Sequence, residues 1–195
     1  MSVKDFVQQR RDALIAMRRD FHMYPEPAWL EYRSAAKVAD RLISLGYDVA
    51  LGADVLDLDS RMGLPSDEVM KAGMDRAIKE GANPELVEKM GYGKTAIVAT
   101  MKFGGESPVV AFRVDMDSND VIEAKEDSHV PTKEGFRSCH DKAMHACGHD
   151  AHMTMGLGLA EYLATHKDEF KGTIKLIFQP AEEGVRGAKA MAEAG

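Results

Sequence analysis

The sequence predicts an α/β fold in which a mixed or parallel sheet is flanked by helices. Amphipathic helical stretches alternate along the chain with short apolar runs, and this alternation is typical of α/β domains. The 195 residues, of which 45% are hydrophobic and 29% charged, are sufficient for one well-buried core of ordinary globular composition. No internal repeat or low-complexity tract interrupts the pattern.

The first part of the chain is predicted to form two helices and a strand. Ser2 with Asp5 three residues later resembles a capping box, which indicates a helix to about residue 20. A break at 22–27 follows, and a second helix is expected from about Glu31. The run YDVAL then predicts a short strand. The buried face of the second helix should carry Ala35, Val38, Ala39, Leu42 and Ile43.

Residues 60–92 differ from their surroundings and are interpreted as a helical insertion. Ser66 can cap a polar helix that extends to about Glu80. Asn83 followed by Pro84 can begin a second helix, because proline is favoured in the first turn.

Two apolar runs after this region predict strands. They are TAIVATM at 95–101 and PVVAFRV at 108–114, and the turn residues Gly104 and Gly105 separate them. We therefore expect the two strands to pair as a hairpin.

The last part of the chain is predicted to form a helix, a strand and a helix. The first helix begins at Asp150, the strand is TIKLIF at 173–178, and the second helix begins near Gly184. This last helix reaches a stop signal at Gly195 with no closing strand after it. An incomplete domain that exposes a sheet edge is therefore expected.

Charge and hydropathy exclude some functions. The net charge of −7, from 25 basic and 32 acidic residues, and the lack of a dense basic stretch argue against a nucleic-acid partner. The start of the chain lacks the apolar core of a signal peptide, and no window approaches the ~18 apolar residues that span a bilayer. A cytoplasmic protein with no membrane association is expected.

Cysteine and histidine usage leaves several roles open. A cytoplasmic chain would keep Cys139 and Cys147 reduced, so a ligand or catalytic role competes with a disulfide and with a plain buried thiol. We interpret Cys139 as a spectator and His22 as a packing or hydrogen-bonding residue. Three further histidines are expected at the surface, namely His129, His140 and His166.

Three segments gather residues that can carry chemistry, and each lies after a predicted strand or before a helix. They are RVDMD at 113–117, MHACGHDAH at 144–152 and QPAEEG at 179–184. Open α/β sheets usually form their sites at such positions.

The middle segment has the composition of an open metal site. Gly148 allows an irregular backbone that can turn Cys147 and His149 toward one ion. A structural zinc site would normally supply four paired Cys or His ligands, whereas this segment has one thiol with carboxylates nearby. A catalytic site is therefore favoured. The side chains that can bind or orient a ligand are His145, Cys147, His149, Asp150 and His152.

The last segment places two adjacent carboxylates, Glu182 and Glu183, after a buried strand and beyond Pro180. Adjacent residues on irregular backbone point in different directions. One carboxylate can therefore bind a metal while its neighbour takes a proton from a metal-bound water.

Together these segments resemble the M20 metallopeptidase family, in its amidohydrolase branch of aminoacylase, hippurate hydrolase and auxin-conjugate hydrolase type. The resemblance rests on MHACGHDAH and FQPAEEG. Within that branch, RMGLPS at 61–66 and SHVPTKEGFRSC at 128–139 are most similar to the members that cleave aminobenzoyl-glutamate. The similarity extends to residues 18–31, 112–117 and 187–195.

The resemblance implies a zinc-exopeptidase-like fold and a site with two divalent metal ions, Zn²⁺ or Mn²⁺. Cys147 and His149 would be ligands, with the Cys147 thiolate bridging the two ions. Glu183 would be a further ligand, and Glu182 the general base. Asp115 or Asp117 would orient a ligand. Supporting roles would fall to His145, Asp150 and His152.

The resemblance also implies what residues 1–195 lack. Members of the family supply two further histidine ligands and a small dimerisation domain, so the chain would be the N-terminal part of the catalytic domain. The whole protein would be a homodimer or pair with a related subunit.

The implied reaction is hydrolysis of the amide bond of an N-acyl or N-aroyl amino acid. The leading substrate is p-aminobenzoyl-glutamate or a related folate breakdown product, and N-acetyl or hippurate-type amino acids are the alternative. A non-catalytic metal-binding or scaffold protein with the same fold is the rival interpretation, and a structural zinc module is a third.

Overall fold

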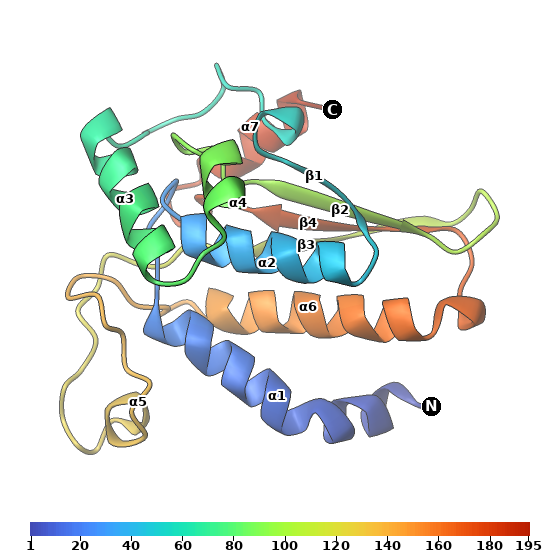
Figure 1. Cartoon of the computed structure of the whole chain (residues 1–195), viewed down its shortest axis with the longest axis horizontal. Helices are drawn as coiled ribbons and strands as arrows, with labels where there is room; N and C mark the ends of the chain where they lie inside the picture. Colours follow the sequence, from blue (N-terminus) through green and yellow to red (C-terminus); the bar gives the residue numbers. More distant parts are fainter.

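The computed structural model describes residues 1–195 and confirms a mixed α/β fold built on one four-stranded sheet (Figure 1). The strand order is β1-β2-β4-β3. β2 is antiparallel to both β1 and β4, whereas β3 is parallel to β4. The strands are β1 (Asp48–Leu51), β2 (Ile97–Lys102), β3 (Val109–Asp115) and β4 (Thr173–Gln179).

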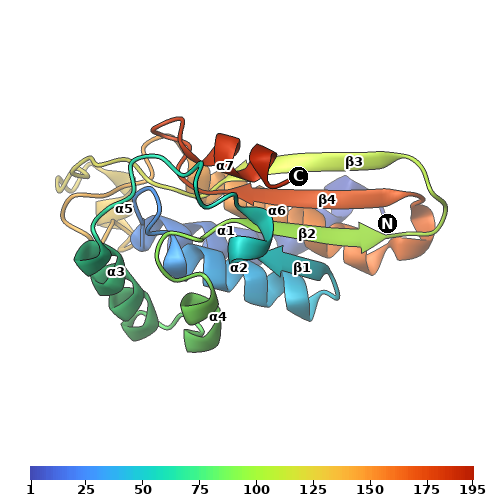
Figure 2. The same ribbon diagram turned by 90° about the horizontal axis from the view of Figure 1, so that it is seen from above.

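Helices cover both faces of the sheet. α2 and α6 pack against one face, α1 packs on the outer side of α6, and α7 contacts β4 from the opposite face (Figures 1 and 2). None of the helices combines the length and apolar character needed to cross a bilayer. The helices are α1 (Val3–Met23), α2 (Tyr32–Ser44), α3 (Asp67–Lys79), α4 (Pro84–Lys89), α5 (Val130–Lys133), α6 (His149–Thr165) and α7 (Gly187–Glu193), with 3₁₀ turns η1 (Gly52–Val55) and η2 (Lys167–Glu169).

The first two helices begin where polar side chains satisfy their free amide groups. The Ser2 hydroxyl accepts a hydrogen bond from the Asp5 amide, as the capping box predicts. α2 is capped from a distance, because the buried Glu26 carboxylate accepts hydrogen bonds from the amides of Arg33 and Ser34. A carboxylate at this end also interacts favourably with the helix dipole.

The buried face of α2 differs from the prediction at one residue, Ile43. The other four residues expected on it are fully buried, but the Ile43 side chain is 51% exposed. It lies in the last turn of the helix, on the solvent side. The prediction for Ile43 was therefore wrong.

The helices predicted within 60–92 are present as α3 and α4. The Ser66 hydroxyl accepts a hydrogen bond from the Val69 amide, and the Asn83 side chain caps α4, which has Pro84 in its first turn. Both helices pack against α2. They therefore extend the helical layer without adding a strand to the sheet.

The predicted hairpin was wrong, because β4 lies between β2 and β3. The connection between β2 and β3 is long enough to pass around the start of β4, which lies between them. The Phe103 amide bonds to the Gly172 carbonyl, and the Thr173 amide bonds to the Pro108 carbonyl. The apolar β4 can pair on both sides, and β3 is joined to it by α6 as a parallel crossover. Turn glycines alone do not identify a strand's partner.

An apolar surface is exposed along β3, as the expected open sheet edge predicts. β3 pairs only with β4, so its outer edge has no partner. Val109 is 61% exposed, Val110 38% and Phe112 42%. Val110 and Phe112 line an apolar groove of about 880 Å³ that α1 and α6 complete.

This surface generates a prediction about self-association. We expect the 195-residue chain to associate through the β3 edge and groove, because unpaired strand edges and large apolar patches promote association. Val110→Lys should shift the sedimentation coefficient toward that of the monomer. Val185→Lys, which replaces another exposed apolar residue outside the groove, is the control and should change nothing. A wild-type chain that is monomeric at high concentration would contradict the prediction.

Candidate metal centre

The three segments that contain the candidate ligand and catalytic residues, 113–117, 144–152 and 179–184, meet at one end of the sheet. β3 and β4 are parallel and Asp115 is in register with Gln179, so the residues after both strands emerge side by side. The N-terminus of α6 lies at the same end (Figure 1). Segments that are distant in sequence therefore converge at the carboxyl edge of the sheet, where open α/β folds bind ligands.

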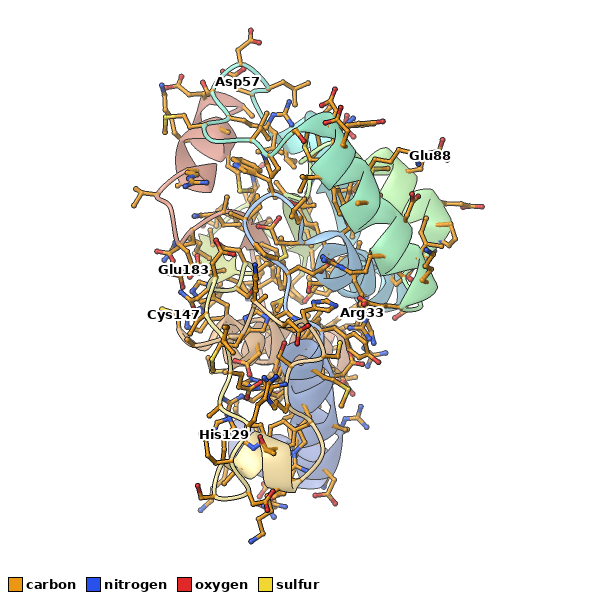
Figure 3. The ribbon with its side chains drawn as sticks, turned by 90° about the vertical axis from the view of Figure 1, so that its left-hand side faces the viewer. Arg33, Asp57, Glu88, His129, Cys147 and Glu183 are labelled. Carbon is orange, nitrogen blue, oxygen red and sulfur yellow. The ribbon has the colours of Figure 1, made fainter.

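The start of α6 depends on the glycine between Cys147 and His149. Gly148 adopts φ +90°, a left-handed conformation that other residues rarely adopt. The Cys147 amide is fixed by a hydrogen bond to the Asn119 side chain. The Cys147 side chain is exposed and lies beside Glu183 (Figure 3), whereas His149 is buried.

Asp117 connects the other two segments and is itself fully buried. Its Oδ1 accepts a hydrogen bond from the Glu182 amide at 2.9 Å, and its Oδ2 accepts one from the Glu183 amide at 3.0 Å. Its backbone carbonyl accepts a hydrogen bond from His149 Nδ1 at 2.7 Å. One residue therefore fixes the backbone of both glutamates and the orientation of the imidazole ring.

The His149 ring is oriented so that Nε2 faces the glutamates. Nε2 lies 3.6 Å from Glu182 Oε2 and 3.7 Å from Glu183 Oε1. Burial alone would lower the pKa of His149, but the hydrogen bonds and charge of Asp117 raise that pKa to about 9. A metal ion bound at Nε2 must therefore displace a proton, as is usual for metal ligands.

Ligand atoms of Cys147, His149 and Glu183 lie within 4.8 Å of one another. Thiolate, imidazole and carboxylate are the donors that zinc takes in proteins, so the residues fit a metal ion. A hydrogen bond to Glu183 and the charge of that group raise the pKa of the Cys147 thiol. The carboxylate would favour a cation in place of this proton.

A second group shares His149 with the first. Ligand atoms of Asp115, His149 and His152 also lie within 4.8 Å of one another. Asp115 Oδ2 is 3.3 Å from His152 Nδ1, and Arg113 forms an ion pair with Oδ1 at 2.7 Å. The ring of His152 stacks on that of His149.

Two residues of the middle segment lie outside these groups. His145 is buried with neither ring nitrogen hydrogen-bonded, and burial lowers its pKa to about 4. The Asp150 carboxylate instead contacts α1, where it accepts hydrogen bonds from His22 at 2.9 Å and Arg18 at 3.3 Å. His22 also bonds Glu123, which confirms its predicted hydrogen-bonding role.

The loop that carries the glutamates has a strained backbone. Ala181 and Val185 adopt positive φ values of 52° and 54°. A Cβ atom on Gly187 would lie 1.8 Å from the Pro180 carbonyl oxygen, so only glycine permits this close approach. The loop is therefore tightly held against the start of α7.

Glu31 holds the glutamate loop in place by hydrogen bonds. The sequence did not predict this role for Glu31. Its carboxylate is fully buried and accepts hydrogen bonds from the Ala181 amide at 2.8 Å and the Thr95 hydroxyl at 2.6 Å. Burial and the charge of Asp117 raise the pKa of Glu31 to about 8. The available signal was a single acid in the otherwise apolar run AWLEY.

The fold and the converging donors define a metallopeptidase-type α/β domain. Residues 111–195 match the model of peptidase family M20/M25/M40. The chain belongs to this family.

Similarity to known proteins extends over the whole chain. It is 48% identical over 194 residues to one of the subunits of p-aminobenzoyl-glutamate hydrolase from Escherichia coli (strain K12), covering 100% of this chain and 44% of that protein. It is 47% identical over 193 residues to indole-3-acetyl-aspartic acid hydrolase of Enterobacter agglomerans, covering 99% and 44%. The chain thus spans less than half the length of these relatives.

Solved structures share the fold. The aminobenzoyl-glutamate utilization protein from Klebsiella pneumoniae matches with a TM-score of 0.83 and 41% identity, over 100% of this chain and 43% of that one. The YXEP protein of Bacillus subtilis, described as a dinuclear metal-binding peptidase from the M20 family, matches with a TM-score of 0.66 and 29% identity, over 98% and 40%.

The geometry at Asp117 predicts the effect of removing one acceptor. Asp117→Asn leaves one of the amides of Glu182 and Glu183 facing an NH₂ group, and a lost buried hydrogen bond of this kind costs about 1–3 kcal/mol. Denaturant unfolding of the metal-free chain should show that loss, and the Glu182 and Glu183 amides should exchange faster. Asp120→Asn, at an exposed neighbouring position, is the control. Equal stability of the two variants would contradict the anchoring role.

Proposed function

We propose that this chain is part of a metal-dependent amidohydrolase that cleaves the amide bond of N-acyl or N-aroyl amino acids. The observation that carries the proposal is that donor atoms of Cys147, His149 and Glu183 lie close together. A second carboxylate, Glu182, lies beside them, and hydrogen bonds to Asp117 fix His149 and the backbone of both glutamates. Similarity to two amidohydrolases over the whole chain supports it.

Cys147, His149 and Glu183 would hold a divalent metal, with Cys147 bridging to a second ion. The description of the Bacillus subtilis structure as dinuclear supports two ions, and the donors suit Zn²⁺ or Mn²⁺. When bound, the metal supplies Lewis acidity that polarises a carbonyl group and acidifies water. Asp117 would orient His149.

Outer contacts around these ligands would complete the site. Asp115 would orient His152 through their 3.3 Å contact. Asp150 would support the start of α6 by holding it to α1 through His22. His145 would support the loop before the helix as a neutral, buried ring.

Glu182 is the proposed general base. Asp117 fixes its backbone, while its side chain is 35% exposed and lies beside His149. A carboxylate held this way can take a proton from the attacking water and deliver it to the leaving amine. General acid–base catalysis of this kind contributes about 10²- to 10⁴-fold to rate.

The proposed substrates are amides of acidic amino acids with an aromatic acyl group. The two named relatives hydrolyse p-aminobenzoyl-glutamate and indole-3-acetyl-aspartate, as their names state. We place p-aminobenzoyl-glutamate, or a related folate breakdown product, first. N-acetyl and hippurate-type amino acids are the alternative.

The chain would form the N-terminal part of a longer protein's catalytic domain, with 60–92 as an inserted helical unit. Its coverage of less than half of each relative supports this view. The longer protein would assemble as a homodimer or with a related subunit, since the Escherichia coli relative is named as a subunit of its hydrolase.

A non-catalytic metal-binding protein with the same fold is the rival. A hydrolysis screen separates the two, with p-aminobenzoyl-glutamate, indole-3-acetyl-aspartate and N-acetyl-glutamate offered to the full-length protein with Mn²⁺ or Zn²⁺. Release of the free amino acid is expected from at least the first substrate. Bound metal without turnover of any substrate would favour the rival.

Glu182→Gln should separate catalysis from metal binding in the full-length protein. The carboxamide cannot accept the water proton, so turnover should fall by about 10²- to 10⁴-fold while metal content stays unchanged. Glu193→Gln, at an exposed position of α7, is the control for the loss of one negative charge. Turnover of the Glu182 variant within twofold of wild type would remove this residue from the mechanism.

Cys147→Ala should lower metal content as well as turnover, because alanine offers no ligand. The loss of affinity should exceed the roughly 10- to 100-fold that loss of an outer hydrogen-bond partner costs. Cys147→Asp keeps an anionic donor and should retain part of the metal. Elemental analysis after removal of loosely bound metal checks both variants, and unchanged metal in Cys147→Ala would exclude the bridging role.

A further inference from the structure

A second group of thiol, imidazole and carboxylate side chains lies away from the sheet edge. Donor atoms of Glu80, Cys139 and His140 lie within 4.8 Å of one another. Glu80 caps the C-terminus of α3, and the other two precede the segment 144–152. Figure 3 places Arg33, which bonds the Glu80 carbonyl, well apart from Cys147 and Glu183.

His140 is held in the same way as His149. Its Nδ1 donates to the Pro25 carbonyl at 2.7 Å, the same distance as between His149 Nδ1 and the Asp117 carbonyl. Such a bond fixes the tautomer of metal-binding histidines and leaves Nε2 free to coordinate. The His140 side chain is only 13% exposed, so the expectation of a surface histidine was wrong.

The contact between His140 and Glu80 requires a proton or a cation between the two side chains. With Nδ1 as the donor, Nε2 of a neutral ring carries only a lone pair, yet it lies 2.8 Å from Glu80 Oε1. Two acceptors at this distance need a proton or a metal ion between them. The other oxygen, Glu80 Oε2, is buried without a hydrogen-bond partner.

Cys139 adds a third donor from a fixed position. Its amide donates to the Met23 carbonyl at 2.9 Å, which ties the loop to the end of α1. Burial and the charge of Glu80 raise the pKa of the Cys139 thiol. Its side chain remains exposed, so an ion can reach it from solvent.

Two arginines, Arg33 and Arg76, lie close enough to the cluster for their charges to act on the Cys139 thiol. The Arg33 guanidinium forms two hydrogen bonds with Asp20, at 2.8 and 3.1 Å, and lies over the Tyr24 ring. The positive charge of Arg76 acts on the buried Glu26 carboxylate, but its Nε and Nη2 atoms are buried without hydrogen-bond partners. The charges of the Cys139 thiolate and the Glu80 carboxylate would together balance that of a divalent ion, so the bound site would add no positive charge beside these arginines.

We propose that Glu80, Cys139 and His140 form an additional zinc site with its fourth position open to water. The mixed sulfur, nitrogen and oxygen donor set is one that zinc accepts. Zinc bond lengths require donor separations of roughly 3.3–3.8 Å, so side-chain shifts of about 1 Å would close the site. The ion would tie α3 to the α1–α2 turn and to the loop before 144–152.

Cobalt spectroscopy tests this site, because the chain has only two cysteines. Co²⁺ substitutes for zinc, and each thiolate bound to it gives a charge-transfer band in the near ultraviolet. The 195-residue chain with Cys147→Ser should keep such a band at one equivalent of Co²⁺. Adding Cys139→Ser should abolish it, and adding His140→Asn should weaken it. Absence of the band in Cys147→Ser would overturn the proposal.

Alkylation of the unmodified chain provides a test that needs no substitution. Zn²⁺ in excess of the amount that fills the Cys147 centre should slow the reaction of Cys139 with iodoacetamide about tenfold or more, because a coordinated thiolate is a poorer nucleophile. Peptide mass spectrometry measures the rate at Cys139 separately from that at Cys147. Equal Cys139 rates with and without zinc would show that His140 and Glu80 share only a proton.

Discussion

The candidate metal centre depends on the three hydrogen bonds of Asp117. Its carboxylate holds the amides of Glu182 and Glu183, and its carbonyl holds the His149 ring. Because Asp117 is fully buried, these bonds are shielded from water and are costly to break. The spacing between the imidazole and the two carboxylates is therefore set before any metal binds, which reduces the reorganisation that binding requires.

The fold brings Asp117 to this position through the parallel pairing of β3 and β4. Asp117 follows β3 by two residues, the glutamate loop follows β4, and α6 connects the two strands. Two further features fix the glutamate loop. Glu31 accepts a buried hydrogen bond from the Ala181 amide, and Gly187, which has no Cβ, allows the backbone to approach the Pro180 carbonyl closely. The strained φ values of this loop persist because these contacts over-determine its path.

Much of this arrangement could be predicted from the sequence, and the failures have physical causes. Local signals such as the Ser2, Ser66 and Asn83 caps acted over a few residues and were sufficient to locate helices. The pairing of β2 and β3 could not be inferred, because the competing partner β4 lies far along the chain. Glu31 was missed for the same reason, since its partners at Thr95 and Ala181 are remote in sequence. Cys147, His149 and Glu183 could be predicted as ligands from the sequence, because these residue types can bind a metal wherever the fold brings them together, and the structure places their donor atoms within 4.8 Å of one another.

Sulfur ligation at the sheet edge is the property that distinguishes a metal held by Cys147 from one bound elsewhere on the chain. Zinc-edge X-ray absorption should be recorded on the zinc-loaded Cys139→Ser chain, in which Cys147 is the only remaining thiol. If Cys147 is a ligand, the spectrum should show one sulfur at about 2.3 Å together with nitrogen or oxygen donors at about 2.0–2.2 Å. A spectrum with nitrogen and oxygen neighbours alone would contradict this ligation, because it would place the metal away from Cys147.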